Sequence, residues 1–240
     1  MRDTILFDIN ETVLDLTPMK ARFDAVFSDQ GVAGQWFASL LHSSCVSAMT
    51  GVESTFADLA GIMLDAMAAR HDVSLSASQR ADILTGFASL PAHADVVPAL
   101  NLFRQHGYRT VAFTNSSWDL VHRQLTHAGL MGHFDDIISV EATGRFKPDP
   151  LVYRFAATEL ERPIGDLRLV ATHDWDTHGA LYAGMRAAYI NRTGAEYHPL
   201  YQKPECLADD MVTLAEHIIA LDKKQVTKNQ HEVSSPAIKR

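Results

Sequence analysis

The stretch Thr4–Phe7, with the sequence TILF, is a short apolar run that ends at Asp8. Further runs of this kind predict strands at Arg109–Phe113, Asp136–Val140, Leu167–Ala171 and Ala187–Ile190. Helical patterns lie between them, at Val97–His106, Ser117–Ala128, Leu151–Leu160 and Asp176–Ala183. Short apolar strands that alternate with helices are typical of an α/β fold, with a doubly wound parallel sheet covered by helices on both faces. Such a sheet binds ligands at the carboxyl ends of its strands, where Asp8, Thr114 and Thr172 are expected.

A long helical block follows the first strand. From Pro18 to Ala92 the periodicity is helical and no convincing strand occurs. The helices are expected at Gln35–Val46, Ser54–Ala69 and Ala77–Ser89. An inserted block of this kind predicts a helical cap over the sheet edge, which can exclude water and select the substrate. We therefore expect a core of residues 1–16 and 93–221, a cap of residues 17–92, and a polar, disordered tail of residues 222–240.

Composition excludes several classes of partner. The 240 residues carry 21 lysines and arginines against 29 acidic residues, a formal charge of −8, which disfavours nucleic acids and anionic membranes. No apolar run reaches the length of a membrane span, and the N-terminus does not read as a signal peptide. Cys45 and Cys206 have no metal-binding or redox spacing and favour a reducing cytoplasm. The sequence predicts a soluble, cytoplasmic protein with a small-molecule partner.

Four segments carry polar residues directly after predicted strands or before a predicted helix. They are FDINET (Phe7–Thr12), FTNSS (Phe113–Ser117), RFKPDPLVY (Arg145–Tyr153) and THDWD (Thr172–Asp176). In this order they resemble the haloacid dehalogenase superfamily, with its Rossmann-like core. FKPDPLVY and YINRTG (Tyr189–Gly194) narrow the resemblance to the L-2-haloacid dehalogenase branch, over roughly residues 3–220.

The resemblance implies a covalent mechanism without metal or cofactor. Asp8 could simply cap a loop, but with Lys147 and Asp176 at the same sheet edge we expect a nucleophile that forms an ester, which water then hydrolyses. Lys147 would keep Asp8 ionised. By resemblance, the hydroxyl of Thr12 fixes the rotamer of the nucleophile. Asp176 would either hold Lys147 or activate the water.

Further residues are expected to contact the substrate. The backbone amides after Asp8, at Ile9 and Asn10, would help to bind its carboxylate, together with the side chains that end the second strand. Family pocket positions match two aromatic residues of the core and one of the cap. The complete set of expected contact residues is Ile9, Asn10, Trp36, Phe37, Thr114, Asn115, Tyr153, His173 and Trp175. Members of the family often pair through the cap, so the resemblance also implies a homodimer.

The chain departs from the family at three places. Asn10 stands where phosphatases of the superfamily carry a general-acid aspartate, so phosphatase chemistry is disfavoured, and dehalogenases usually have tyrosine there. If Trp36 is the cap tryptophan of the family, Phe37 replaces the arginine that stabilises the departing halide. No arginine occurs between Arg22 and Arg70 to take its place. His173 stands where the family commonly has asparagine.

We interpret these changes through charge. A site that lacks the arginine and gains Asn10, His173 and Asp174 is expected to be less cationic and richer in acceptors, which suits an amine leaving group. The leading expectation is hydrolysis of L-azetidine-2-carboxylate to 2-hydroxy-4-aminobutyrate, as in the dehalogenase-like hydrolases of that strained ring. The alternative is a dehalogenase for (S)-2-haloacids or haloacetate. A phosphatase and a catalytically inactive binding module remain as further alternatives.

Overall fold

Six parallel strands form one sheet at the centre of the molecule. The structure is a computed structural model, which describes residues 3–233 and the side chains of residues 3–225. The strand order is β3-β2-β1-β4-β5-β6, with every neighbouring pair parallel. The strands are β1 (Thr4–Phe7), β2 (Arg109–Thr114), β3 (Asp136–Ser139), β4 (Leu167–Ala171), β5 (Arg186–Ile190) and β6 (Cys206–Ala208). This topology confirms the predicted α/β fold with a doubly wound parallel sheet.

The central strand β1 is also the point at which the chain changes direction across the sheet. From β1 the chain proceeds to β2 and β3 on one side, and then crosses to β4 on the other. Phe7 pairs with Ala112 of β2 and Val170 of β4, so Asp8 emerges between the ends of these neighbours. A position of this kind is where open α/β sheets bind their ligands.

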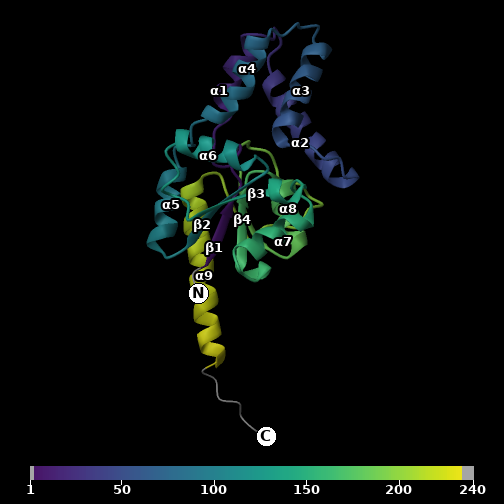
Figure 1. Ribbon diagram of the computed structural model, residues 1–240. Coiled ribbons are helices and arrows are strands. Elements are labelled where there is room, and N and C mark those ends of the chain that lie inside the picture. The colour runs from purple at the N-terminus through teal and green to yellow at the C-terminus, as the bar shows by residue number, and fades with distance from the viewer. Residues whose placement is uncertain (1–2, 234–240) are drawn as a thin grey trace.

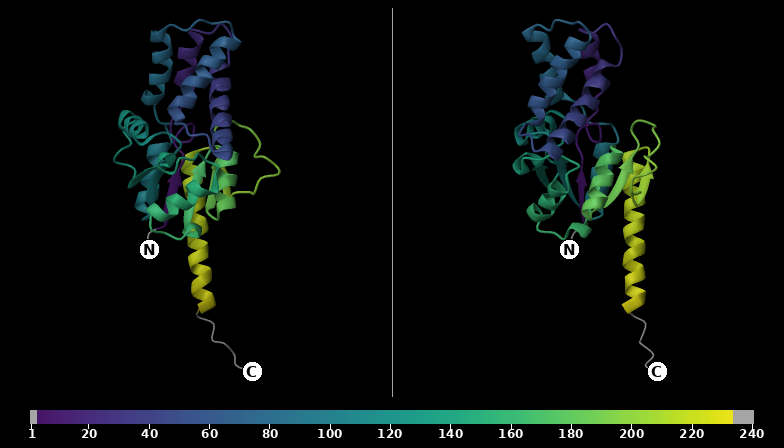
Figure 2. Two further views of the ribbon diagram at one scale, coloured as in Figure 1. Left: turned by 45° about the vertical axis from the view of Figure 1, so that its right-hand side comes forward. Right: turned by 90° about the vertical axis from the view of Figure 1, so that its right-hand side faces the viewer.

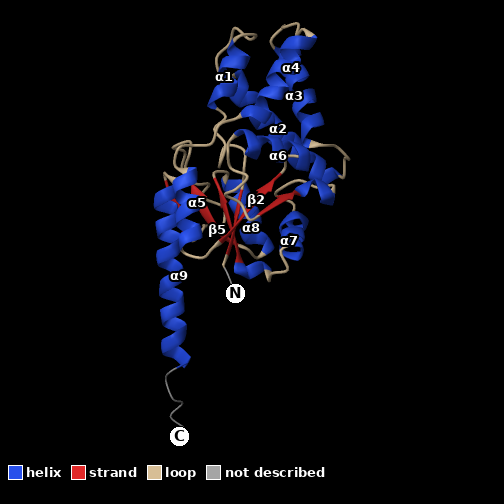
Figure 3. Cartoon of the chain, turned by 60° about the vertical axis from the view of Figure 1, so that its left-hand side comes forward, coloured by secondary structure: helices blue, strands red, loops and turns tan. Residues whose placement is uncertain are grey.

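Helices cover both faces of the sheet, as Figure 3 shows with strands in red and helices in blue. The core helices are α5 (Val96–Gln105), α6 (Trp118–His127), α7 (Pro150–Glu159), α8 (Asp174–Ala183) and α9 (Met211–Val233). α5 packs on α9, while α7 packs on α8 on the opposite side of the sheet (Figure 1). The central strands contribute fully buried apolar residues such as Leu6, Val111, Phe113 and Val170, as a sheet covered on both faces requires.

The inserted block between β1 and α5 forms four helices above the carboxyl edge of the sheet (Figures 1 and 2). They are α1 (Thr17–Asp24), α2 (Val32–Thr50), α3 (Phe56–Arg70) and α4 (Ala77–Gly86), here called the cap. Capping boxes fix the starts of α3 and α4, through Thr55 with Asp58 and Ser76 with Gln79. Trp36 is buried among Phe23 and Phe87 in an aromatic centre of the cap.

The C-terminal region differs from the sequence expectation. The predicted disordered tail is wrong for residues 222–233, which continue α9 as helix, whereas residues 234–240 lie outside the described residues. The polar composition of this segment gave the wrong prediction because charged contacts, which composition does not show, attach the helix to the core. Asp222 accepts hydrogen bonds from Arg168, Arg186 and Tyr108, at 2.6–2.9 Å. A helix fixed at such a point propagates further at little cost.

Other differences are smaller. The strand β6 and the helix α1 were not expected, because each is short and carries a weak pattern. α8 begins at Asp174 rather than at Asp176. Within residues 3–233, no helix has both the length and the apolar character needed to cross a lipid bilayer.

Candidate active site

The loops after β1, β2 and β4 meet at the carboxyl edge of the sheet, beneath the cap. Asp8 follows β1, and its backbone N–H donates to the carbonyl of Val170 in β4, at 3.0 Å. Its side chain is 9% exposed. A carboxylate this deeply buried needs partners for its charge, and those partners define the site.

Lys147 lies between two carboxylates. Its Nζ donates to Asp8 Oδ1 at 3.2 Å and to Asp176 Oδ2 at 2.9 Å. A third hydrogen bond, to the carbonyl of Phe113 at 2.9 Å, uses the remaining proton of the ammonium group. The structure therefore brings together the three charged residues that the sequence motifs placed at this edge.

The charges within this cluster set one another's protonation. Burial alone would raise the pKa of Asp8. The charge of Lys147, followed by the hydrogen bond and charge of His173, outweighs burial and holds that pKa well below its usual range. Burial also opposes the charge of Lys147, but Asp176 and Asp8 raise its pKa above the ordinary value. Asp8 is thus an ionised carboxylate at neutral pH.

Asp176 is completely buried and forms an ion pair with Lys147. Burial, together with the like charge of Asp8, raises the pKa of Asp176 in spite of the ammonium group beside it. Its Oδ1 accepts a hydrogen bond of 2.6 Å from the hydroxyl of Tyr153, which is itself fully buried. Burial and the charge of Asp176 raise the pKa of Tyr153, so this hydroxyl stays protonated and donates. Tyr153 therefore holds Asp176 in place.

Thr12 fixes the other oxygen of the nucleophile. Its hydroxyl donates to Asp8 Oδ2 at 2.8 Å and accepts the backbone N–H of Thr172 at 3.0 Å. The turn that returns Thr12 to Asp8 passes through Glu11, whose φ of 64° is in the left-handed region. The expected contact between Thr12 and the nucleophile is present in the structure.

His173 bridges two carboxylates. Its Nδ1 lies 3.2 Å from Asp8 Oδ2 and its Nε2 lies 2.8 Å from an oxygen of Glu11. Burial alone would lower the pKa of this imidazole, but hydrogen bonds to Asp8 and Glu11, with their charges, raise it to about 10. Both ring nitrogens therefore carry protons at neutral pH.

This protonation corrects the expectation of a site richer in acceptors. His173 is a cation that donates twice, and it partly replaces the positive charge of the arginine expected at the position of Phe37. Glu11 is the functional residue that sequence reasoning left without a role. Its position next to the Asp8 motif was visible, but its pairing with a residue 162 positions away was not.

Aromatic rings hold His173 from two sides. The ring centroid of Trp175 lies 5.1 Å away at an interplanar angle of 27°, and that of Phe37 lies 6.3 Å away. Phe37 thus reaches the site from the cap. The Nε1 of Trp36 donates to the carbonyl of Ala60 within the cap, at 2.9 Å. Trp36 borders a cavity of about 240 Å³ that Phe37 and Glu11 also line.

The side chains of Asn10 and Thr114 hydrogen-bond with residues that follow β2. The amide nitrogen of Asn10 donates to Ser116 Oγ, and its oxygen accepts from Gln124, both at 3.1 Å. The hydroxyl of Thr114 accepts the backbone N–H of Ser116 and is fully buried. The amide of Asn10 is thus engaged with Ser116 and with Gln124 of α6, and contacts of Asn10 and Thr114 with a substrate stay predictions.

Ile9 and Asn115 differ in what they offer. The side chain of Ile9 is fully buried in the core, so only its backbone can serve the site. The side-chain oxygen of Asn115 accepts the N–H of Lys147 at 3.0 Å, which ties the ends of β2 and the lysine segment together. Asn115 also lines a small cavity with Phe56 of the cap and with Arg145. Among the described residues, no group of three or more His, Cys, Asp or Glu side chains is arranged to hold a metal ion.

Comparisons with known proteins agree with this geometry. Residues 2–166 match the model of the haloacid dehalogenase-like hydrolases, and the chain belongs to this family. The (S)-2-haloacid dehalogenase of Pseudomonas sp. (strain YL) is 25% identical over 203 residues, covering 84% of this chain and 88% of the relative. The (S)-2-haloacid dehalogenase H-109 of Pseudomonas putida is 23% identical over 217 residues, covering 90% and 97%. The predicted superfamily and the prediction of a hydrolase are confirmed.

A solved structure resembles the whole described fold. The L-2-haloacid dehalogenase RSc1362 aligns with a TM-score of 0.86 and 25% sequence identity, covering 90% of this chain and 98% of that one. The similarity includes the cap as well as the sheet, since so little of either chain remains outside it. The site is therefore that of a hydrolase with an ionised, buried carboxylate as its nucleophile candidate.

Proposed function

We propose that this hydrolase converts small (S)-2-haloacids into 2-hydroxy acids through an ester of Asp8. The observation that carries the proposal is the buried Asp8 carboxylate, which Lys147 and His173 keep ionised by direct contact. A desolvated anion of this kind is a strong nucleophile toward carbon. The names of the similar proteins support a haloacid as the substrate class.

The reaction has two steps. In the first, a carboxylate oxygen of Asp8 attacks C2 of the substrate from the side opposite the halogen, so that halide departs and the configuration at C2 inverts. In the second, water attacks the Cγ of Asp8, and the 2-hydroxy acid leaves with the oxygen that had attacked. Lys147 stabilises the carboxylate before attack and after its regeneration. Asp176 positions Lys147, and its raised pKa makes it suited to take a proton from the water.

The leaving group is halide in this proposal rather than the ring nitrogen of L-azetidine-2-carboxylate. The interpretation of an amine leaving group depended on a site rich in acceptors, whereas His173 adds a positive charge beside Asp8, with both of its N–H groups bound to carboxylates. A cationic neighbourhood favours an anionic leaving group. The ring-opening reaction stays as the second candidate, because Phe37 still occupies the position aligned with the arginine of dehalogenases.

A side-by-side assay separates these substrates. The purified protein is given (S)-2-chloropropionate or L-azetidine-2-carboxylate without added metal, and chloride and 2-hydroxy-4-aminobutyrate are measured. We expect chloride release, abolished in Asp8→Asn. Ring opening without chloride release would replace the halide with the amine and leave the role of Asp8 intact.

An isotope experiment tests the ester itself. During turnover in oxygen-18 water, the label is expected in the side chain of Asp8 after several cycles, because water attacks its Cγ. Label that appears only in the 2-hydroxy acid would contradict the covalent route. Magnesium-dependent release of phosphate from p-nitrophenyl phosphate would instead favour a phosphatase.

The formation of a homodimer and a cytoplasmic location stay predictions.

A further inference from the structure

The two oxygens of the Asp8 carboxylate have different surroundings. Oδ2 accepts two hydrogen bonds, from the Thr12 hydroxyl at 2.8 Å and from His173 Nδ1 at 3.2 Å. Oδ1 accepts one hydrogen bond, from Lys147 Nζ at 3.2 Å. Since each carboxylate oxygen has about two lone-pair sites, Oδ2 is fully occupied and Oδ1 keeps one lone pair free. Oδ1 is therefore the oxygen able to attack a substrate.

We infer that His173 is a catalytic residue of the second step, in which it forms an oxyanion hole with Thr12 around Asp8 Oδ2. The inference rests on the proposed ester of Asp8. If Oδ1 bonds to the substrate carbon, Oδ2 becomes the carbonyl oxygen of the ester, and its two donors already surround it. The imidazolium and the hydroxyl then stabilise the negative charge that develops there when water adds.

The bonds and protons of this step balance. Water oxygen bonds to Cγ, and the π-electron pair of the carbonyl moves to Oδ2. When the tetrahedral intermediate collapses, that pair restores the double bond and the Cγ–Oδ1 bond breaks. One proton of the water goes to Oδ1, which leaves as the hydroxyl of the product, and the other is released as Asp8 ionises again. His173 keeps its own protons throughout.

Glu11 is the positioning residue for this imidazolium. Its carboxylate accepts from Nε2 at 2.8 Å, so that the ring presents Nδ1–H to Asp8. Ester formation removes the charge of Asp8 and lowers the pKa of His173 from about 10, whereas Glu11 continues to support the protonated form. From the cap and from α8, the rings of Phe37 and Trp175 lie against the imidazole.

The experiment compares the rates of ester formation and ester hydrolysis in variants of His173. His173→Phe keeps a flat ring between its aromatic neighbours but has no donor, and His173→Asn restores a neutral donor. His178→Phe is the matched control, because His178 lies one turn along α8 and stacks on Tyr201 instead. Rapid quenching with (S)-2-chloropropionate, followed by mass spectrometry of the Asp8 peptide, measures formation and decay of the ester.

We expect ester hydrolysis to fall by about 10²–10³-fold in His173→Phe, the usual effect of losing one oxyanion donor, so that the adduct accumulates after a burst of chloride. Ester formation should change much less, and His173→Asn should recover part of the lost rate. Glu11→Gln, which retains a hydrogen-bond acceptor, should slow hydrolysis more mildly. The hydrolysis rate of the unaltered protein should also fall as pH rises through the pKa of His173 in the ester, a dependence absent from His173→Asn.

Two outcomes would contradict this scheme, one refuting the role of His173 and the other refuting the ester of Asp8. Equal losses in both half-reactions without adduct accumulation, in His173→Phe and Glu11→Gln alike, would show that His173 only supports the fold, and would refute the inference alone. If the unaltered protein releases chloride without an Asp8 adduct or oxygen-18 in Asp8, the proposed ester itself is refuted.

Discussion

Replacing Lys147 with methionine tests the electrostatic basis of the site. The change keeps a long, flexible chain of similar volume but leaves Asp8 and Asp176 without the cation between them. Unit charges 3.2 Å apart attract by about 5 kcal/mol at an effective dielectric constant of about 20. Breaking a buried ion pair typically costs about 3–5 kcal/mol, so ionising Asp8 becomes harder by a similar amount.

The expected result appears in the pH profile of kcat/KM. Asp8 must be ionised to attack, so activity rises with pH, and the acid limb in Lys147→Met should move upward by about two to four pH units. Chloride release from (S)-2-chloropropionate is measured from pH 3 to pH 9 in buffers of constant ionic strength; the acid limb of the unaltered protein should lie below this range, whereas that of Lys147→Met should appear within it. Lys203→Met, an exposed site in the loop after β5, is the control for loss of a positive charge. An active Lys147→Met variant with an unmoved acid limb would refute the reasoning.

Variants at three further positions test individual contacts. Thr12→Val removes a buried hydroxyl that both donates and accepts a hydrogen bond, and should lower the free energy of unfolding in urea by about 1–3 kcal/mol. Thr12→Ser should lower it less. Equal losses of stability in the two variants would contradict this role of the hydroxyl. Tyr153→Phe removes the 2.6 Å hydrogen bond to Asp176 and should cost about 1.5–3 kcal/mol, so an unchanged urea midpoint would count against it. The Arg168 contacts lower the pKa of Asp222 to about 2, so this carboxylate stabilises the fold above about pH 4 and the gain is lost as pH falls toward 2. Asp222→Asn should therefore cost about 2–3 kcal/mol at pH 7 and little at pH 2; a loss independent of pH would disprove the linkage.

The main charged residues of the site were predictable because the sheet brings distant segments together by a simple rule. Asp8, Lys147 and Asp176 each follow a strand or lie before a helix, and the ends of parallel strands share one edge. The central strands were also predictable, since each is a short apolar run between polar turns. Neither inference required knowledge of a side-chain conformation.

Other parts of the site depended on side-chain directions that a sequence does not contain. Asn10 follows the nucleophile closely, yet its amide turns to Ser116 and Gln124. The charge of His173 depends on Glu11, and this pairing follows from a single left-handed residue in the turn after β1. An argument from residue types alone therefore predicted too little positive charge for this part of the site.

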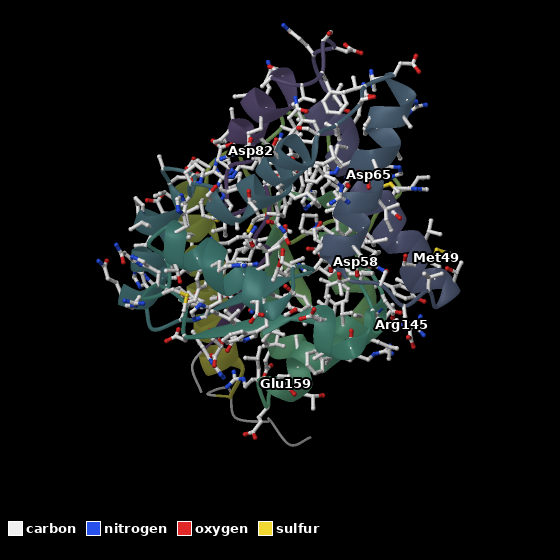
Figure 4. The ribbon with its side chains drawn as sticks, turned by 45° about the horizontal axis from the view of Figure 1, so that its top comes forward. Met49, Asp58, Asp65, Asp82, Arg145 and Glu159 are labelled. Carbon is white, nitrogen blue, oxygen red and sulfur yellow. The ribbon has the colours of Figure 1, made fainter. Side chains whose placement is uncertain are left out.

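The segment that carries Lys147 is attached to the cap as well as to the core. Arg145, two residues earlier, donates to the carbonyl of Ala48 near the end of α2, and Figure 4 shows Arg145 close to Met49 at this border. Movement of α2 away from the sheet would pull on the same short segment that neutralises the nucleophile. The position of the cap and the position of Lys147 are thus connected through one hydrogen bond and two residues of backbone.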